Sequence, residues 1–379
     1  MNLSRQTYVE VNLDNINYNI EKIKGYISND IKLAIVVKAN GYGHGAVEIC
    51  KHIDTDLVNY ICVASLSEAL ELRYNNISLP ILVMGYIPET YFELAIKNNI
   101  TITVFSTNQA NQINEICKQL KMKCMVHIKI DTGFNRLGFK VEENTIKELK
   151  HILELKYIFV EGIFSHLALT NKDEDYKQFE KFKTIADEIL NYKYIPIKHI
   201  CDSIGMVAYK DFHMDMVRVG ASIYGYNSRK SNLNLREAIT FKSKIIQVKK
   251  VLKGEGISYD YSYIACKDMH IGVVPCGYAD GIPRHLSNKG YVMVNKKICN
   301  IVGKICMDQM IIDLSNLDKG DYDKDVILYG QNGPNLLEVA NLCDTNRNEI
   351  ISLISRRVDR VYKKDNRVIK SLNYILRGD

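Results

Sequence analysis

The sequence predicts an α/β fold, a (β/α)8 barrel of the TIM type followed by a mostly β domain. In roughly the first 220 residues, apolar runs of strand length alternate eight times with amphipathic helical segments. This alternation indicates a parallel sheet, and eight such units favour a closed barrel. After about residue 230, short alternating runs replace the helical segments. A G-x-G-x-x-G fingerprint, which would favour the alternative of an open doubly wound sheet, is absent.

The elements of the barrel follow from hydrophobic periodicity. Asp14 is a candidate N-cap for a helix whose apolar face holds Ile16, Ile20 and Ile23. The amphipathic segments between strands include Ser65–Tyr74, Asn108–Leu120 and Asp173–Tyr192. The predicted barrel strands lie near residues 33–38, 59–63, 80–84, 101–104, 124–130, 157–164, 196–200 and 214–218.

The second domain is expected over residues 231–379, after a barrel domain over residues 1–230. A further alternating run at 8–12 is assigned to the first domain, with pairing to the β domain as the alternative. Asn295-Lys-Lys297 indicates a hairpin connection, and Asn335–Leu342 and Glu349–Ser355 a helical interlude. The predicted β segments are Thr240–Val251, Ile271–Pro275, Tyr291–Val294, Ile298–Val302, Met310–Leu314 and Val326–Tyr329.

Composition narrows the class of protein. The net charge is +6, but positive and negative residues are interspersed, so no nucleic-acid partner is expected. No apolar run approaches the roughly 18 residues of a membrane span, and no signal peptide is recognisable, so membrane contact is not expected. The 10 cysteines form no C-x-x-C pair and no zinc spacing, which favours free thiols in the cytoplasm and no metal site. A soluble part excised from a longer protein is the alternative.

Polar residues follow several predicted strands, where barrel enzymes carry their functional groups. They are Lys38 with Tyr42, Lys129 with Asp131 and Arg136, His166, Asp202 with Ser203, and Arg218 with Gly220 and Ala221. Each has an ordinary alternative: Lys38 reaching solvent, Lys129 solvated, His166 in the core, Ser203 as an N-cap, Arg218 in a structural ion pair. Together they suit an anionic aromatic ligand, with donors for a phosphate and a lysine that forms a Schiff base with an aldehyde.

Six segments, in order along the chain, resemble the alanine racemase family. They are Val36-Val-Lys38-Ala-Asn-Gly-Tyr42-Gly-His-Gly45, His127-Ile-Lys129-Ile-Asp-Thr-Gly-Phe-Asn-Arg136-Leu-Gly138, Val217-Arg218-Val-Gly220-Ala-Ser-Ile-Tyr224-Gly225, Ser258-Tyr259, Cys276-Gly-Tyr278-Ala-Asp-Gly281 and Gly303-Lys-Ile-Cys-Met307-Asp-Gln309.

The resemblance implies a pyridoxal-phosphate enzyme that racemises a small amino acid, most simply L-alanine to D-alanine for peptidoglycan precursors. By the same resemblance, the enzyme would work as a head-to-tail homodimer with shared active sites. Lys38 would hold the cofactor and act as one base, and Tyr259 from the partner subunit as the opposite base. Two bases on opposite faces of a planar intermediate account for racemisation.

The resemblance also implies roles for the other residues of the site. Tyr42, Ser203, Gly220 and Ala221 would bind the phosphate, and Arg218 would face the pyridine nitrogen. His166 and Tyr224 complete the cofactor site, with His166 between Arg218 and Tyr259. Arg136, Met307 and Tyr278 would form the substrate site, and in many relatives the lysine matching Lys129 is carbamylated.

The chain departs from the family at a few positions. Val219 and Asp359 replace prolines, Asp260 replaces a glycine, and Arg356 stands where some relatives have a phosphate-contacting tyrosine. Substrate choice is therefore open. The alternatives are a serine racemase, as in the soluble half of vancomycin-resistance racemases, a decarboxylase, which would usually have an acid in place of Arg218, and a non-catalytic cofactor carrier, which would lack the β domain.

Overall fold

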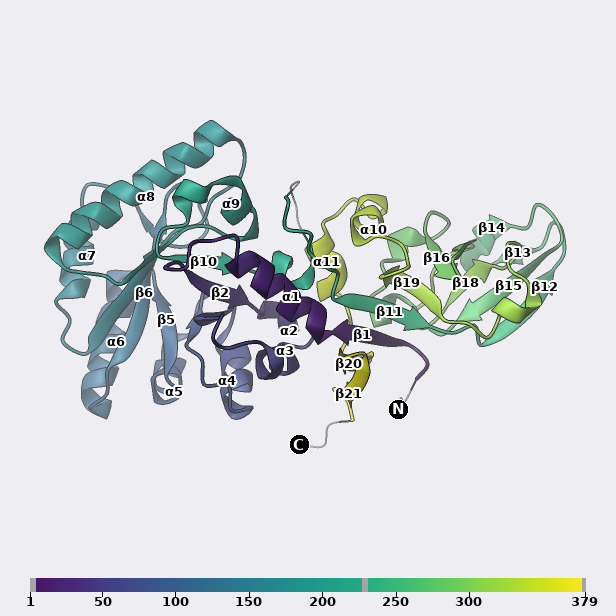
Figure 1. The fold of residues 1–379 in the computed structure, drawn as a ribbon, viewed down its shortest axis with the longest axis horizontal. Coiled ribbons are helices and arrows are strands. Elements are labelled where there is room, and N and C mark those ends of the chain that lie inside the picture. The colour runs from purple at the N-terminus through teal and green to yellow at the C-terminus, as the bar shows by residue number, and fades with distance from the viewer. Residues whose placement is uncertain (1–4, 227–230, 377–379) are drawn as a thin grey trace. The chain divides into compact units, whose positions relative to one another are not determined.

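The computed structural model describes residues 5–226 and 231–376. The chain divides into two compact units (Figure 1), each described here by itself. The barrel unit comprises Asn17–Gly41 and Ile49–Arg236, and the β unit comprises Met1–Ile16, Tyr42–Glu48 and Glu237–Asp379. The boundary expected at residue 230 falls on residues 227–230, which lie outside the described part of the chain.

The barrel unit contains the predicted parallel barrel. Its strands, in the described residues, pair in the order β10-β2-β3-β4-β5-β6-β8-β9. Two backbone hydrogen bonds join the ends of that order, from Asp215 N to Lys198 O (3.0 Å) and from Arg218 N to Cys201 O (3.0 Å), so the sheet is nearly closed. The strands are β2 (Lys32–Val36), β3 (Tyr60–Val63), β4 (Ile81–Val83), β5 (Ile100–Val104), β6 (Cys124–Asp131), β8 (Ile158–Phe164), β9 (Ile197–His199) and β10 (Met216–Val219).

The helices of the barrel unit lie outside these strands (Figure 1). Their starts follow from capping chemistry: Ser65 and Ser106 accept hydrogen bonds from the third backbone N–H of α4 and α6. The three predicted amphipathic segments are confirmed within one residue at each end. The helices are α4 (Leu66–Tyr74), α5 (Phe92–Lys97), α6 (Thr107–Leu120), α7 (Thr145–Leu153), α8 (Lys172–Tyr192) and α9 (Ser203–Ala208); α1 (Leu13–Lys24) and α3 (Ala46–His52) begin in segments of the β unit.

The β unit is built on a sheet with the strand order β17-β16-β19-β11-β1-β20-β21 in the described residues. A smaller sheet has the order β12-β15-β18, and β13 pairs with β14. Its strands are β1 (Tyr8–Asn12), β11 (Ile239–Ser243), β12 (Gln247–Val251), β13 (Gly256–Ile257), β14 (Tyr263–Ile264), β15 (Met269–Val274), β16 (Tyr291–Val294), β17 (Lys297–Asn300), β18 (Met310–Asp313), β19 (Val326–Gly330), β20 (Asp359–Lys364) and β21 (Arg367–Leu372), and its helices are α10 (Leu336–Leu342) and α11 (Arg347–Ser352).

Local chemistry explains the hairpin between β16 and β17. Its two connecting residues, Asn295 and Lys296, have φ values of 47° and 63°. Positive φ at both central positions defines the type I′ turn, whose twist matches that of the strands. The predicted hairpin is therefore confirmed.

Three local predictions were wrong, and two strands were missed. Asn12, rather than Asp14, caps α1, because its Oδ1 accepts from Asn15 N (2.9 Å) while Asp14 accepts from Asp365 N (2.8 Å). Thr240–Val251 is two strands of different sheets, β11 and β12. The second interlude helix begins at Arg347 and ends at Ser352. Strands β20 and β21 were not predicted, since β20 is specified by pairing with β1 across the length of the chain.

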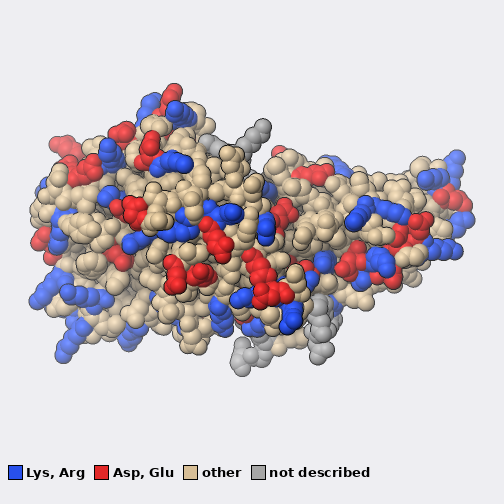
Figure 2. Space-filling view, viewed as in Figure 1, with Lys and Arg blue, Asp and Glu red and all other residues tan. Residues whose placement is uncertain are grey.

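The surface is polar and mixed in charge. Positive and negative side chains are interspersed over the face that Figure 2 shows. Among the described residues, every helix is too short or too polar to cross a bilayer. Within the same residues, no group of three or more His, Cys, Asp or Glu side chains could hold a metal ion, and the cysteines are free thiols.

Candidate active site

Lys38 begins a left-handed turn directly after β2. The strand ends at Val36, two residues earlier than predicted, and the next φ values are 52° at Ala39, 52° at Asn40 and 61° at Gly41. A left-handed conformation costs a non-glycine residue about 1–2 kcal/mol, so it persists only where surrounding contacts hold it. The Gly41 N–H donates to Val37 O (2.7 Å), and the Tyr224 hydroxyl donates to Val36 O (3.2 Å). Lys38 is thus fixed at the carboxyl end of a barrel strand.

Four basic side chains, from the carboxyl ends of three strands, lie near His166. Burial, followed by the charges of these side chains, lowers the pKa of His166 to about 2, so its imidazole is neutral; the side chains are Arg218, Lys129, Arg136 and Lys38. Among the described residues, none of the four has a carboxylate oxygen within 4.0 Å of its charged nitrogens. The nearby carboxylates of Asp131 and Asp202 instead accept backbone N–H groups at 2.9–3.0 Å. This cluster therefore carries a surplus of positive charge.

Both lysines of this positive cluster are biased toward the neutral amine. Burial and the Arg136 charge lower the pKa of Lys38, although Glu68 and Asp202 oppose the shift. Burial, Arg218 and Arg136 lower the pKa of Lys129 well below its usual value. Lys129 is 7% exposed and its ammonium lies 4.8 Å from the centre of the Phe164 ring, so the alternative of a solvated lysine is wrong. A neutral amine is the form that attacks an aldehyde or takes up a proton.

Arg218 is held in the barrel by three acceptors. Its NH2 group donates to Ser165 O (2.9 Å) and Ile200 O (2.9 Å), and NH1 donates to His199 Nδ1 (2.5 Å). These contacts use three of the five guanidinium N–H donors, counted over the described residues, and leave two for a ligand. No carboxylate is among these partners, so the alternative of a structural ion pair does not describe Arg218.

The arginine fixes the protonation of two buried histidines. Because a guanidinium only donates, His199 Nδ1 must accept and its proton lies on Nε2. That proton is donated to His127 Nδ1 (2.8 Å), so the His127 proton lies on its own Nε2, 3.4 Å from Glu161 Oε2. The Tyr60 hydroxyl donates to the same Glu161 oxygen (2.6 Å). A chain of polar groups thus runs from Arg218 to Glu161.

Several residues that contact the positive cluster were not predicted from the sequence. The Phe134 ring lies 5.2 Å from His166 and 4.4 Å from the Arg136 guanidinium, and Phe164 stacks on His199 at 4.7 Å. The available signal was polar residues within otherwise apolar barrel strands, at His127 and His199. Ser203 is not the N-cap of α9: Asp202 caps the helix, and the Ser203 hydroxyl accepts from Gly220 N (3.0 Å).

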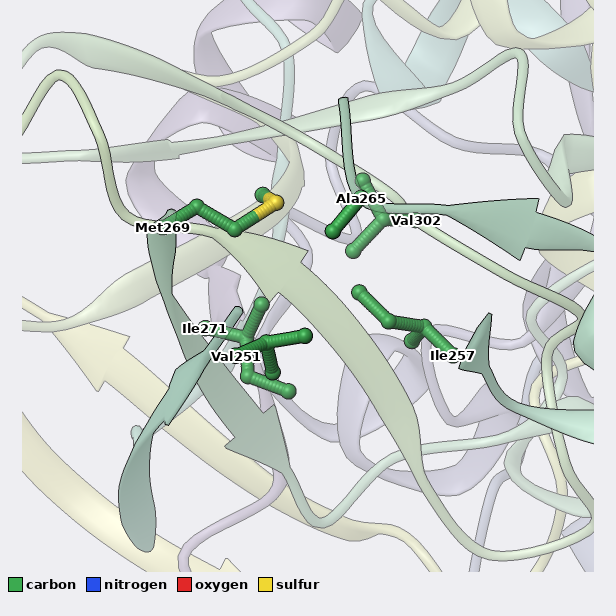
Figure 3. Packing of buried hydrophobic residues seen from close by; sticks show 6 residues of the cluster. All are labelled: Val251, Ile257, Ala265, Met269, Ile271 and Val302. Carbon is green, nitrogen blue, oxygen red and sulfur yellow. The ribbon is translucent and has the colours of Figure 1, made fainter. Parts of the chain in front are cut away.

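Tyr259 lies in the β unit on a strained turn between β13 and β14. The φ values of Ser258, Asp260 and Tyr261 are 65°, 56° and 45°. Both flanks are anchored, since Ile257 and Ala265 belong to the buried cluster in Figure 3, with Val251, Met269, Ile271 and Val302. The anchored flanks hold the phenol outward, 61% exposed.

A second group of predicted site residues lies next to this turn. The Ser258 hydroxyl donates to Lys304 O (2.5 Å), and the Lys304 ammonium pairs with Asp260. Two residues further on, Cys306 O accepts from Tyr278 N (3.1 Å) and Met307 O accepts from Ala279 N (3.0 Å). Tyr259, Tyr278 and Met307 therefore occupy one region of the β unit, which we call the tyrosine cluster.

The structure distributes the predicted residues over both units. The barrel unit brings together Lys38, Lys129, Arg136, His166 and Arg218 as the positive cluster, with Ser203, Gly220, Ala221 and Tyr224 at or beside the same strand ends. The β unit contains Tyr42 and the tyrosine cluster.

Comparison with known proteins identifies the family. Residues 11–228 match the model of the alanine racemase N-terminal domain, and residues 238–362 match that of its C-terminal domain. "Alanine racemase 1" of Oceanobacillus iheyensis is 40% identical over 94% of this chain and 98% of its own. The structure of alanine racemase from Clostridium difficile 630 superimposes with a TM-score of 0.95 at 39% identity, covering 99% of this chain and 100% of that chain. A structure titled alanine racemase from Bartonella henselae with covalently bound pyridoxal phosphate has a TM-score of 0.85 at 26% identity, covering 94% and 99%.

A barrel unit and a β unit that match both domain models in order define an amino-acid racemase, an isomerase. The chain belongs to the alanine racemase family.

Proposed function

We propose that this enzyme interconverts L-alanine and D-alanine in the cytoplasm with pyridoxal phosphate, using Lys38 and Tyr259 as opposite bases. The surplus of positive charge around a lysine of lowered pKa is the observation that carries the proposal. A guanidinium stays charged, and the guanidinium groups of Arg136 and Arg218 have no carboxylate within 4.0 Å among the described residues, which favours an anionic ligand at the barrel rim.

The residues of the rim fit the cofactor in charge and chemistry. Lys38 would bind its aldehyde carbon, and its phosphate would be held by Ser203, the backbone at Gly220 and Ala221, and Tyr42. Ser203 and Gly220 already contact each other at 3.0 Å, which brings a hydroxyl and a glycine turn to one place. The two unused donors of Arg218 suit the ring nitrogen, and Tyr224 supports the strand that precedes Lys38. Bound pyridoxal phosphate supplies an electron sink that acidifies the α-carbon of the amino acid.

Racemisation then depends on moving a proton between two faces of that carbon. Lys38, whose lowered pKa eases formation of the neutral amine, would take or return the proton on one face, and Tyr259 on the other. Arg136, the backbone N–H of Met307 and Tyr278 would hold the substrate carboxylate and side chain. His166, neutral because its pKa is so low, would lie between Arg218 and Tyr259 without adding charge. We propose carbamylation of Lys129, since its buried amine is biased to the neutral form that reacts with carbon dioxide.

Arg218 would restrain side reactions. A guanidinium is unlikely to give up a proton, and three buried acceptors hold it in place. The nitrogen of the cofactor ring facing it would therefore stay unprotonated and withdraw fewer electrons than a pyridinium. This weaker sink favours return of the α-proton over transamination.

We also propose a head-to-tail homodimer in which each domain contributes one base. Residues 1–230 would bind the cofactor and residues 231–379 would present Tyr259 to the partner subunit. The exposed groups of the β unit support this proposal: Tyr259, Tyr261, Tyr278 and Met307 are 61%, 71%, 41% and 53% exposed. Aromatic side chains on a protein surface are typical of an interface with another chain.

Two measurements test the proposal. The first is a racemase assay of the purified protein on L-alanine and L-serine in parallel. We expect alanine to be the better substrate. Both amino acids must be assayed, because a small pocket discriminates against one added hydroxyl by only about 10². Faster turnover of serine would favour the alternative of a serine racemase. A yellow protein inert toward both would indicate a cofactor carrier instead.

The second measurement identifies the lysine that binds the cofactor. Borohydride reduction followed by peptide mapping should label Lys38. Lys129 is the matched control, because its pKa is also lowered and it belongs to the same positive cluster. Label on Lys129 would overturn the assignment.

A further inference from the structure

One buried carboxylate, Asp280, joins three separate segments of the β unit. Its side chain is fully buried, and Oδ1 accepts from Arg5 NH1 (2.5 Å) and from Arg357 Nε (2.7 Å). The other oxygen, Oδ2, accepts from Gly277 N (2.9 Å). Its own backbone carbonyl accepts from Ser355 N (3.1 Å).

These contacts lead directly to two predicted site residues, Tyr278 and Met307. The turn that Asp280 closes contains Tyr278, whose N–H donates to Cys306 O (3.1 Å), next to Met307. Arg357 continues from Asp280 to Asp308 (2.7 Å), on the other side of Met307. Arg357 also follows Arg356, the residue that departs from the family's phosphate-contacting tyrosine.

The segments are packed too closely to move independently. A Cβ on Gly277 would lie 2.4 Å from both Cys306 O and Met307 O, and one on Gly281 would lie 2.6 Å from Leu353 O. The 354–358 segment is also held by Arg360, which donates to Ile354 O (2.9 Å), Ser355 O (2.6 Å) and Val358 O (2.7 Å). Loosening one ionic contact should therefore shift all three segments together.

We infer that Asp280 is a positioning residue for the substrate site: through Arg357 it fixes Tyr278, Met307 and Arg356 relative to one another. The inference rests on the proposed function for the roles of Tyr278 and Met307, and on the geometry alone for the mechanical coupling of the three residues. Asp280 itself does not touch the substrate. Burial would raise the pKa of this carboxyl, but hydrogen bonds from Arg5, Arg357 and Gly277 outweigh it and keep the pKa below its usual value.

The test compares Asp280→Asn with a matched control. Asn keeps the shape and the acceptor for Gly277 but loses the charge that binds both arginines. Asp321→Asn is the control, because Asp321 is also a mostly buried carboxylate of the β unit, closes the same kind of turn by accepting from Asp318 N, and pairs with Lys297. Among the described residues, its side chain contacts Asn295, Lys297 and Asp318, none of which is a predicted site residue.

We expect Asp280→Asn to raise the KM for L-alanine about tenfold or more with a smaller change in kcat and unchanged cofactor content, because displacements of about 1 Å in a site cost up to 10²-fold. Arg357→Gln, at a residue 28% exposed, should give the same split even where Asp280→Asn folds poorly, and Arg357→Lys should restore part of the affinity. Asp321→Asn should leave KM unchanged. An unchanged KM in folded Asp280→Asn and Arg357→Gln, or an equal rise in Asp321→Asn, would overturn the inference.

Amide hydrogen exchange separates this inference from the proposed function. In Asp280→Asn, exchange should accelerate together in segments 277–281, 305–309 and 354–358, and in Asp321→Asn it should not. That result would hold even if the wild-type protein racemised nothing, in which case only the proposed function would fail. Acceleration confined to 277–281 would mean that Asp280 caps its own turn and positions nothing else.

Discussion

The positive cluster of the barrel unit and the tyrosine cluster of the β unit differ in whether their basic side chains are paired with carboxylates. The four basic side chains of the positive cluster have no carboxylate within 4.0 Å among the described residues. Around the tyrosine cluster, positive side chains are paired: Lys304 with Asp260, and Arg357 with Asp280 and Asp308.

This difference teaches what each region can contribute. Unpaired positive charge creates affinity for an anion and shifts the pKa of nearby lysines and histidines, which is useful for binding and proton transfer. Paired charge adds little net field but fixes loops, which is useful for presenting exposed groups such as Tyr259 in one orientation. The following predictions test whether chemistry and positioning divide in this way.

The largest effect should come from removing the Tyr259 hydroxyl, since this phenol is the one group of the tyrosine cluster to which we assign chemistry. Tyr259→Phe should retain bound cofactor, while racemisation falls by about 10²–10⁴, the usual contribution of a general base. Exchange of the α-proton should survive better from D-alanine, where Lys38 still works. Deuterium incorporation measured separately on each enantiomer checks this; equal loss from both, with cofactor bound, would contradict a face-specific role.

A mixing experiment should show a nearly as large gain. Lys38→Ala and Tyr259→Phe should each be inactive, but in a head-to-tail dimer their heterodimer has one site with both lesions and one with neither. Random subunit exchange should therefore restore roughly a quarter of wild-type activity. Each variant mixed with itself is the control, and stable exchanged mixtures without activity would indicate sites built within one chain.

The same contrast explains what could be predicted from the sequence. Lys38, Lys129, His166, Ser203 and Arg218 were found because a barrel collects its functional groups at strand ends, so local periodicity locates them. His199 was missed because the predicted strand ran to residue 200, whereas β9 ends at His199, which contacts Arg218. Asp280 and Arg5 were missed for a different reason: 275 residues separate them, and nothing local to either one predicts a contact at that distance along the chain.

Backbone conformation shows the same limit at Lys38. The glycines at 41, 43 and 45 indicated a loop, but Ala39 and Asn40 also have φ values of 52°. A left-handed turn at non-glycine residues depends on surrounding contacts rather than on propensity. The sequence therefore located the lysine correctly and extended its strand two residues too far.

A smaller effect is expected in the pH dependence of stability. At neutral pH, Asp280→Asn should lower the free energy of unfolding by about 3 kcal/mol, at the low end for a broken buried pair because both arginines remain partly exposed. The folded-state pKa of Asp280 lies below its usual value of 3.8. Its contribution is therefore complete above about pH 4 and is lost as the pH falls through the folded-state pKa. Urea unfolding of the wild type and Asp280→Asn, at the same protein concentration and over a range of pH, should show that the difference in free energy of unfolding becomes smaller in acid. A difference that does not change with pH would mean that the charge of Asp280 is not its source.

The smallest effect concerns the support beneath the positive cluster. His199→Leu removes the acceptor for Arg218 NH1 but leaves Ser165 O and Ile200 O in place. One buried donor without a partner costs about 1–3 kcal/mol, and the two remaining acceptors favour the lower half of that range. His199→Gln is the control, because its amide oxygen can accept from Arg218 while its nitrogen donates toward His127, and it should recover part of the loss. The chain of polar groups from Arg218 to Glu161 can also affect catalysis by orienting Arg218. In that case His199→Leu should lower kcat at unchanged cofactor content, and His199→Gln should restore kcat together with stability. If both variants matched the wild type in stability and in kcat, Ser165 O and Ile200 O alone would be enough to hold Arg218.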